Sequence, residues 1–157
     1  MTDLHLGARL DDLQSRIDGW LTAFADGNEM VAAIDRGTSD ETRFGEPRWY
    51  VRMLGDEKDY TTVWLTLGQR TLRYETYVMP APEENVAELN ELLLRRNDTL
   101  IGAHFSIGLE DAVYLRGEIP DAAVSADELD RILGTLYTTV EANFRALIRL
   151  GFASRFA

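Results

Sequence analysis

The chain has 157 residues, 45% of them hydrophobic, and a formal net charge of −11. This hydrophobic content excludes a disordered chain, and the length predicts one domain over residues 1–157. The acidic balance repels phosphate backbones and argues against nucleic acid as a partner, while the absence of cysteine excludes disulfides and thiolate metal sites.

The first predicted element is an amphipathic helix, which ends at Asp26-Gly27-Asn28. Its apolar residues recur at helical spacing and form one stripe: Leu10, Leu13, Ile17, Trp20, Leu21 and Phe24. The short apolar stretch Met30–Ile34 is interpreted as the lead-in to an edge strand. The polar stretch Arg36–Pro47 carries Gly and Pro and is predicted to be a loop.

Three alternating segments follow and predict an antiparallel meander: Arg48–Met53, Thr61–Leu67 and Thr71–Met79. Gly68-Gln69 lies between the last two. Because Gly accepts a positive φ, this pair predicts a two-residue type II′ hairpin turn.

A second helix is predicted after Pro82, with Glu83 and Glu84 in its first turn and an end at Asn97-Asp98. A second hairpin then pairs Ala103–Ile107 with Ala112–Glu118. Ser125 and Glu128 form a capping box, and the last helix follows with these apolar positions: Leu129, Ile132, Leu133, Leu136, Val140, Phe144, Leu147 and Ile148. The predicted fold class is α+β, in the order α-β-β-β-α-β-β-α, with the first and last helices packed on one face of the sheet.

Alternation along the strands sorts their side chains into two faces. The aliphatic set is expected under the helices: Trp49, Val51, Met53, Val63, Leu65, Leu67, Leu72, Tyr74, Val78, Phe105, Ile107, Val113 and Leu115. The other set is rich in Trp, Tyr, Arg and Met: Tyr50, Arg52, Trp64, Arg73, Glu75, Tyr77, Met79, His104, Tyr114 and Arg116.

No catalytic, cofactor-binding or metal-ligating set is predicted. The two histidines, His5 and His104, are far apart in the sequence, and no Ser lies in a G-x-S-x-G elbow. The glycines form no phosphate-binding motif. Glu83-Glu84 and Glu110-Asp111 are paired carboxylates, but they lie at element starts or turns, where capping and solvation explain them.

The second face can be interpreted in two ways. Thr, Tyr and Trp are good strand formers, and Arg–Glu pairs solvate an open sheet, which explains each residue singly. As a group, however, these residue types are enriched at binding hot spots. We therefore expect a protein-binding surface made of Tyr50, Arg52, Trp64, Arg73, Tyr77, Tyr114 and Arg116.

The element order on a small acidic chain resembles the fold of type III secretion chaperones. More specifically, the chain resembles the YbjN-domain family of bacterial sensory transduction regulators, in an actinobacterial branch. The segments that carry the resemblance are Trp49-Tyr50-Val51-Arg52, Leu72–Asn85, Leu93–Asn97, Phe105–Gly108 and Gly151–Ser154.

The resemblance implies a non-enzymatic, protein-binding regulator or chaperone-like module, and it carries over no catalytic residue. Secretion chaperones of this class are homodimers, and we expect a homodimer here as well. No apolar run approaches the ~20 residues that span a bilayer. We therefore expect a cytoplasmic protein that does not bind a membrane. From the resemblance we expect it to bind a protein partner. The alternative from another class is a small enzyme or small-molecule-binding domain with a pocket between sheet and helix.

Overall fold

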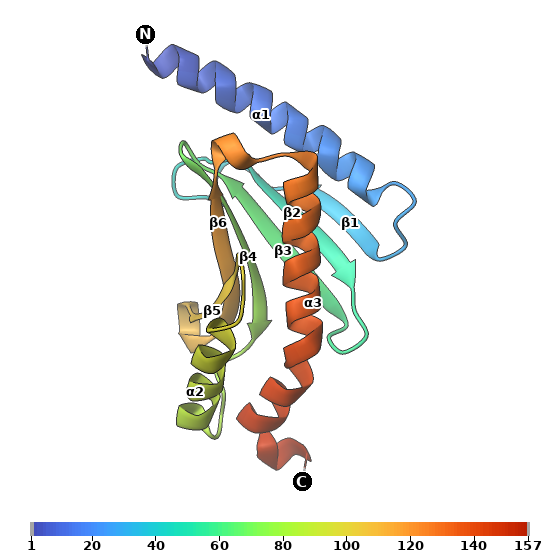
Figure 1. The fold of residues 1–157 in the computed structure, drawn as a ribbon, viewed down its shortest axis with the longest axis vertical. Coiled ribbons are helices and arrows are strands. Elements are labelled where there is room, and N and C mark those ends of the chain that lie inside the picture. Colours follow the sequence, from blue (N-terminus) through green and yellow to red (C-terminus); the bar gives the residue numbers. More distant parts are fainter. Residues whose placement is uncertain (1, 157) are drawn as a thin grey trace.

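Six antiparallel strands form the sheet, in the spatial order β1-β2-β3-β4-β6-β5 (Figure 1). The computed structural model describes residues 2–156, and the side chains of residues 7–156. The stretch that was interpreted as the lead-in to an edge strand becomes part of strand β1, which adds one strand to the predicted order. The strands are β1 Val31–Arg36, β2 Arg48–Leu54, β3 Tyr60–Leu67, β4 Thr71–Met79, β5 His104–Ile107 and β6 Val113–Pro120.

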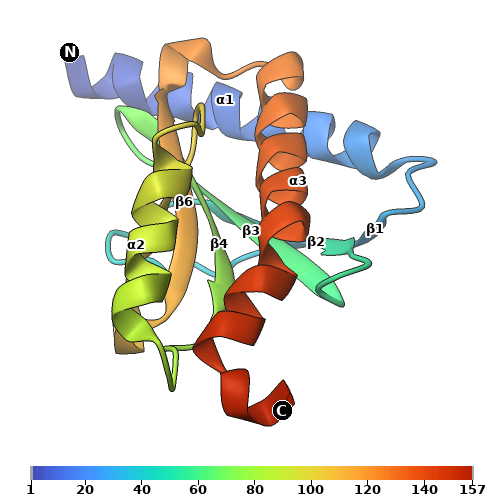
Figure 2. The ribbon, with the colours of Figure 1, turned by 60° about the horizontal axis from the view of Figure 1, so that its bottom comes forward.

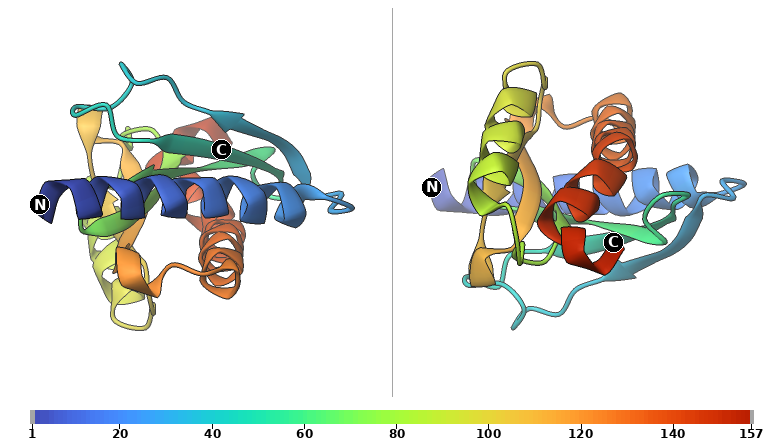
Figure 3. Two further views of the ribbon diagram at one scale, coloured as in Figure 1. Left: turned by 90° about the horizontal axis from the view of Figure 1, so that it is seen from above. Right: turned by 90° about the horizontal axis from the view of Figure 1, so that it is seen from below.

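Three helices pack on the sheet: α1 Thr2–Ala25, α2 Val86–Asn97 and α3 Ala126–Gly151. Helix α3 runs along the sheet, α2 lies beside it, and α1 crosses one end (Figure 1, Figure 2). Views from above and below place α2 and α3 on one side of the sheet and the chain between β1 and β2 on the other (Figure 3). The predicted α+β class, with the terminal helices packed against an antiparallel sheet, is confirmed.

The core lies between the sheet and the helices. Val51, Leu65 and Leu115 project from three strands and are completely buried, as is Leu136 in the middle of α3. Helix α1 joins this core from its own end of the sheet through Ile17 and Leu21, and other buried members include Trp49, Val63, Leu72, Tyr74, Phe105, Ile132 and Val140. The aliphatic set is therefore buried as the alternation predicts, except for Ile107.

A β-bulge near the end of β4 corrects the position of Met79. Tyr77 pairs with Tyr114 and Met79 pairs with Val113, so Val78 is an extra residue in the ladder. An extra residue inverts the alternation beyond it. Val78 and Met79 are consequently both buried, and the prediction that Met79 belongs to the second face is wrong.

The edge strand β5 corrects a second residue. Ile107 was expected in the core, but 53% of it is exposed, because it ends a strand that has a neighbour on one side only. The outer side of β5 is covered by a side chain of α2. The Asn97 amide donates to the Phe105 carbonyl at 3.1 Å and accepts from the Phe105 N–H at 2.7 Å, as a neighbouring strand would.

Glu83 and Glu84 precede α2, which begins at Val86, so the prediction that they lie in its first turn is wrong. Both backbone N–H groups donate to the carbonyl of Gly151 at the end of α3, at 2.9 and 3.0 Å. The Glu84 carboxylate also accepts from the Ser154 N–H at 2.9 Å. Hydrogen bonding with the Ser154 side chain, and secondly with this N–H, lowers the pKa of the carboxyl group. The two acids thus tie the C-terminal segment to the loop before α2.

The turn between β3 and β4 is displaced by one residue from the prediction. Leu67 pairs with Leu72 and the Gly68 N–H donates to the Thr71 carbonyl at 3.0 Å, so Gln69-Arg70 is the two-residue connection. Gly68 precedes this connection and its φ is not positive, so the prediction of a type II′ turn at Gly68-Gln69 is wrong. Gly68 instead allows a close approach, because a Cβ there would lie 3.0 Å from a carboxylate oxygen of Glu46.

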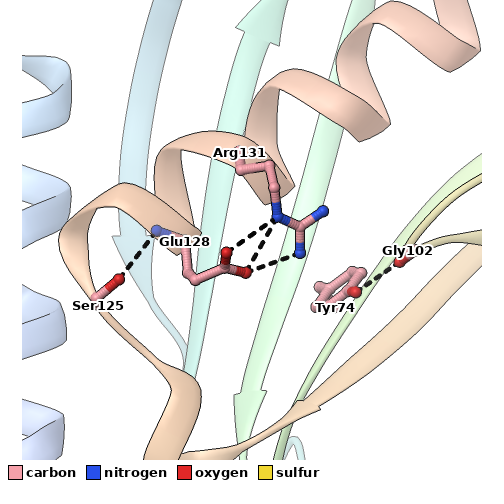
Figure 4. A network of polar contacts seen from close by, with 5 residues as sticks. All are labelled: Tyr74, Gly102, Ser125, Glu128 and Arg131. Atoms are coloured by element: carbon pink, nitrogen blue, oxygen red, sulfur yellow. Dashed lines mark hydrogen bonds and ion pairs between the residues drawn. The ribbon is translucent and has the colours of Figure 1, made fainter.

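The start of α3 is fixed by a polar network (Figure 4). Ser125 accepts from the Glu128 N–H at 3.1 Å, which confirms one half of the predicted capping box. The Glu128 carboxylate pairs with Arg131 instead of completing the box. Arg131 lies against Gly102, whose carbonyl accepts from the Tyr74 hydroxyl at 2.5 Å. The helix start, the loop before β5 and strand β4 are thereby held together.

Leu136→Ala should destabilise the protein by about 2–5 kcal/mol, because it leaves a cavity at the centre of the contact between α3 and the sheet. The measurement is the free energy of unfolding from denaturant titration. Leu94→Ala is the matched control: Leu94 is 70% exposed on α2, and its loss should change stability by less than about 0.5 kcal/mol. Equal midpoints for the two variants would contradict the packing of α3 on the sheet.

Candidate protein-binding face

The side of the sheet opposite the helices is called the open face. The strand register places its residues, because directly paired residues project to the same side. Tyr50 pairs with Trp64, Trp64 with Glu75, and Glu75 with Arg116. All seven residues predicted for a binding surface lie on this face: Tyr50, Arg52, Trp64, Arg73, Tyr77, Tyr114 and Arg116.

Four aromatic rings form a continuous row across the open face. The ring centroids of Tyr50 and Trp64 are 6.3 Å apart, those of Trp64 and Tyr114 6.4 Å, and those of Tyr114 and Tyr77 5.7 Å. The Tyr50–Trp64 and Tyr77–Tyr114 pairs are edge-to-face, which is a favourable geometry for aromatic rings. The row therefore links strands β2, β3, β6 and β4 through contacts between aromatic rings.

Exposure along this row is uneven. Tyr50, Trp64 and Tyr77 are half-buried, whereas Tyr114 is only 7% exposed. The turn after β5 covers Tyr114: a Cβ at Gly108 would lie 2.6 Å from its ring. The expectation that Tyr114 is an exposed member of the surface is therefore wrong, and Tyr114 supports the ring of Trp64 from the side. Burial raises the pKa of the Tyr77 hydroxyl, and the nearby Tyr114 and Glu110 raise it further.

Two of the arginines on the open face are neutralised by carboxylates. Arg116 donates to Glu75 at 2.9 Å and to the Ser106 hydroxyl at 3.2 Å, and its guanidinium carbon lies 4.3 Å from the centre of the Tyr114 ring. Arg73 pairs with Glu46 at 3.0 Å. These side chains form a polar rim beside the aromatic row.

Two further arginines lie on β2 and stack on aromatic rings. The guanidinium carbon of Arg52 lies 3.8 Å from the centre of the Tyr60 ring, and that of Arg48 lies 5.8 Å from the centre of the Trp64 ring. Arg48 also donates from Nε to the Thr66 hydroxyl at 3.0 Å. Arg48 was absent from the predicted surface, although its alternation with Tyr50 along the strand could have indicated it.

The loop between β1 and β2 lies on the same side as the open face (Figure 3). It brings Glu46 to Arg73 and Glu41 to the Tyr50 hydroxyl, which donates to the carboxylate. Burial, and secondly Glu41, raise the pKa of the Tyr50 hydroxyl. Gly37 lets this loop approach, because a Cβ there would lie 3.2 Å from the Tyr50 ring. Sequence patterns gave no sign of these long-range contacts.

The only lysine of the chain, Lys58, lies at one end of the aromatic row. Its ammonium donates to the Tyr77 carbonyl at 2.6 Å and lies 5.2 Å from the centre of the Tyr77 ring. Burial lowers the pKa of this ammonium to about 8. Nothing in the turn sequence around Lys58 predicts this environment, because the burial comes from β4 and α3.

His104 lies beside Glu75, Arg73 and Arg116 around a hollow of about 210 Å³ on the open face. His5 lies outside the described side chains. Among the described residues, no group of three or more His, Asp or Glu side chains is arranged to hold a metal ion. Within the same part of the chain, no helix combines the length and apolar character required to cross a membrane.

The sequence and the fold of this chain are similar to those of known bacterial proteins. Residues 16–149 match the family model YbjN, described as "Putative bacterial sensory transduction regulator". An uncharacterized protein of Mycobacterium tuberculosis is 36% identical over 108 residues, and one of Mycobacterium leprae is 33% identical over 107 residues. These alignments cover 69% and 68% of this chain but only 59% and 58% of the relatives.

Two solved structures share the fold. One is a chain of the heterodimeric ExoU–SpcU complex from the type III secretion system of Pseudomonas aeruginosa, with a TM-score of 0.53 and 15% identity over 83% of this chain and 96% of that chain. The other is a chain of the complex between the Yersinia pestis type III secretion chaperone SycH and a stable fragment of YscM2, with a TM-score of 0.50 and 17% identity over 82% and 96%. The chain therefore shares the fold of these secretion-system proteins, as the resemblance implied.

The free energy of unfolding should rise with pH between about pH 8 and about pH 10, because the buried Lys58 loses its proton at a lower pH in the folded than in the unfolded chain. In this window the unfolded state binds more protons, so alkaline pH favours folding. Lys58→Met, which cannot titrate, and Lys58→Arg, which stays charged, should both lack this rise in denaturant titrations. A wild-type profile parallel to both variants would contradict the buried position of Lys58.

Proposed function

From its membership of the YbjN family, matched over residues 16–149, we propose that this chain is a non-enzymatic protein-binding regulator or chaperone-like module of the bacterial cytoplasm. Its open face binds a protein partner. The observation that carries the proposal is the row of four aromatic rings flanked by arginines on the side of the sheet away from the helices.

The chemistry of this row supports protein binding. Aromatic side chains bring a large apolar area with few rotatable bonds, and arginine brings planar, directional donors. Both are enriched among the residues that dominate binding energies. Trp64 is the central anchor of the row, because Tyr50 and Tyr114 hold its ring from two sides.

The fold neighbours give independent support. SpcU and ExoU form a heterodimeric complex, and SycH is bound to a fragment of YscM2. By analogy, a chain of this fold is suited to holding another protein. The shared fold does not determine which partner is bound, because that depends on the surface residues of each protein. In this chain, the proposed binding surface is the open face.

Charged side chains on the open face and before α2 also support a non-enzymatic role. Arg116 and Glu75 neutralise one another, as do Arg73 and Glu46. Glu83 and Glu84, a pair that acid–base catalysis could have used, are engaged by the C-terminal segment. These side chains have structural partners that explain their positions.

Trp64→Ala should weaken partner binding by about 2 kcal/mol or more, as truncation of a central anchor does. Its thermal midpoint should fall less than that of Leu136→Ala, because Trp64 faces away from the core. Trp49→Ala is the matched control: Trp49 lies on the core side of β2 and is 2% exposed, so its loss should mainly reduce stability. Partners captured from the native cell by tagged protein supply the binding assay.

If Trp49→Ala mainly weakened binding and Trp64→Ala mainly lowered the thermal midpoint, binding would not use the open face. In particular, a large loss of stability with unchanged association in Trp64→Ala would remove the basis of the proposal.

We further propose that the chain forms a homodimer. Strand β1 is an outermost strand, and outermost strands present unpaired backbone groups that a second copy can cover.

Sedimentation equilibrium at micromolar concentrations should therefore give about twice the 17.7 kDa mass of one chain. A single species with the mass of one chain across this range would contradict the homodimer.

A further inference from the structure

The loop between β1 and β2, residues 37–47, is called the strap. Both of its ends are fixed to the sheet, because the Gly37 N–H donates to the Arg48 carbonyl at 2.8 Å and the Leu67 N–H donates to the Pro47 carbonyl at 2.9 Å. A surface loop of this length whose ends lie close together is an Ω-loop, a type of loop that frequently has a function. The strap lies on the side of the open face (Figure 3).

Between its two ends, the strap bonds mainly to itself. The Glu41 N–H donates to the Thr38 carbonyl at 3.1 Å, and the Thr42 hydroxyl donates to the Glu46 carbonyl at 3.0 Å. Phe44 is the one large apolar residue between the ends, and it is 76% exposed. The strap therefore has internal bonds that keep its shape, and apolar packing contributes little to holding it on the sheet.

Two carboxylates attach the strap to the open face. The Tyr50 hydroxyl donates to Glu41, and Arg73 donates to Glu46 at 3.0 Å. Among the described residues, these are the only hydrogen bonds that join residues 38–46 to the strands. The Arg73 side chain is 53% exposed, and ion pairs exposed to solvent contribute little stability. The position of the strap therefore depends on two side-chain contacts that water can replace.

The same two contacts cover part of the proposed binding surface. Tyr50 is the ring beside Trp64 in the aromatic row, and a Cβ at Gly37 would lie 3.2 Å from the Tyr50 ring. The Tyr50 hydroxyl and the Arg73 guanidinium are both engaged by carboxylates of the strap. A partner that contacts these two groups must therefore displace the strap first.

We propose that the strap is autoinhibitory: it closes over Tyr50 and Arg73 in the free chain and leaves the open face when a partner binds there. The inference rests on the proposed protein-binding function and adds its regulation. The closed strap lowers the apparent affinity of the face in proportion to the fraction of chains in which it is open. Its release requires no change in the sheet, because paired strands carry both Tyr50 and Arg73.

The test compares the wild type with three variants of the full chain. Glu41→Ala combined with Glu46→Ala removes both carboxylates. Gly37→Ala keeps them but places a Cβ 2.8 Å from the Glu41 carboxylate, so it disturbs the attachment by a different route. Asp40→Ala is the matched control, because the Asp40 carboxylate accepts from the Thr38 hydroxyl within the strap.

Two measurements are made on each chain. Hydroxyl-radical footprinting with mass spectrometry gives the accessibility of the Tyr50 ring, with Tyr60, which is 42% exposed, as the internal reference. Binding is measured as the retention of proteins from the native cell by limiting amounts of tagged chain. Only proteins that are lost with Trp64→Ala are counted, so that the measurement reports on the open face.

The double variant and Gly37→Ala should both show faster oxidation of Tyr50, with oxidation of Tyr60 unchanged. They should bind the Trp64-dependent proteins about three- to tenfold more tightly, as loss of two exposed contacts implies. Asp40→Ala should match the wild type in both measurements.

Unchanged oxidation of Tyr50 in both opening variants would overturn the inference, because the two contacts would then not hold the strap. Faster oxidation with equal or weaker retention would also overturn it, because the strap would then not compete with the partner. In both cases, retention that depends on Trp64 leaves the protein-binding function in place. If no retained protein depends on Trp64, the binding function and the autoinhibition are disproved together.

Discussion

The alternation of side chains along a β-strand is the constraint on which the rest of this molecule depends. Six paired strands convert it into two faces, and helices cover only one of them. Where a strand is regularly paired, a residue that faces the helices therefore has sequence neighbours that point the other way. A core rich in Leu and Val and an opposite face rich in Tyr, Trp and Arg are two results of one pattern.

Much of this arrangement can be predicted from the sequence, because it depends on local periodicity. The positions of Val63, Leu65 and Leu67 on the core side follow from alternation alone, and the stripe of α3 follows from its helical spacing. Predictions failed where one strand changes register or ends. Val78 and Met79 are both buried because of a single extra residue, and no residue type marks that bulge in the sequence.

The candidate surface shows the same division. Its seven predicted residues share a face, since the register of β2, β3, β4 and β6 is continuous around them. The sequence could not predict what covers them. Tyr114 is buried by a turn, Tyr50 contacts Glu41 of a loop, and Lys58 is buried against β4 and α3. The whole fold brings these segments into contact, and no local sequence pattern indicates that they meet.

The amide of Asn97 has a consequence for assembly. By bonding both backbone groups of Phe105, it closes one border of the sheet, while β1 forms the other border. Fibrous growth by strand addition requires two borders that can each accept a new strand. Because Asn97 occupies one border, β1 is the border left for strand addition, and the homodimer proposed above would be a closed pair if it forms through β1.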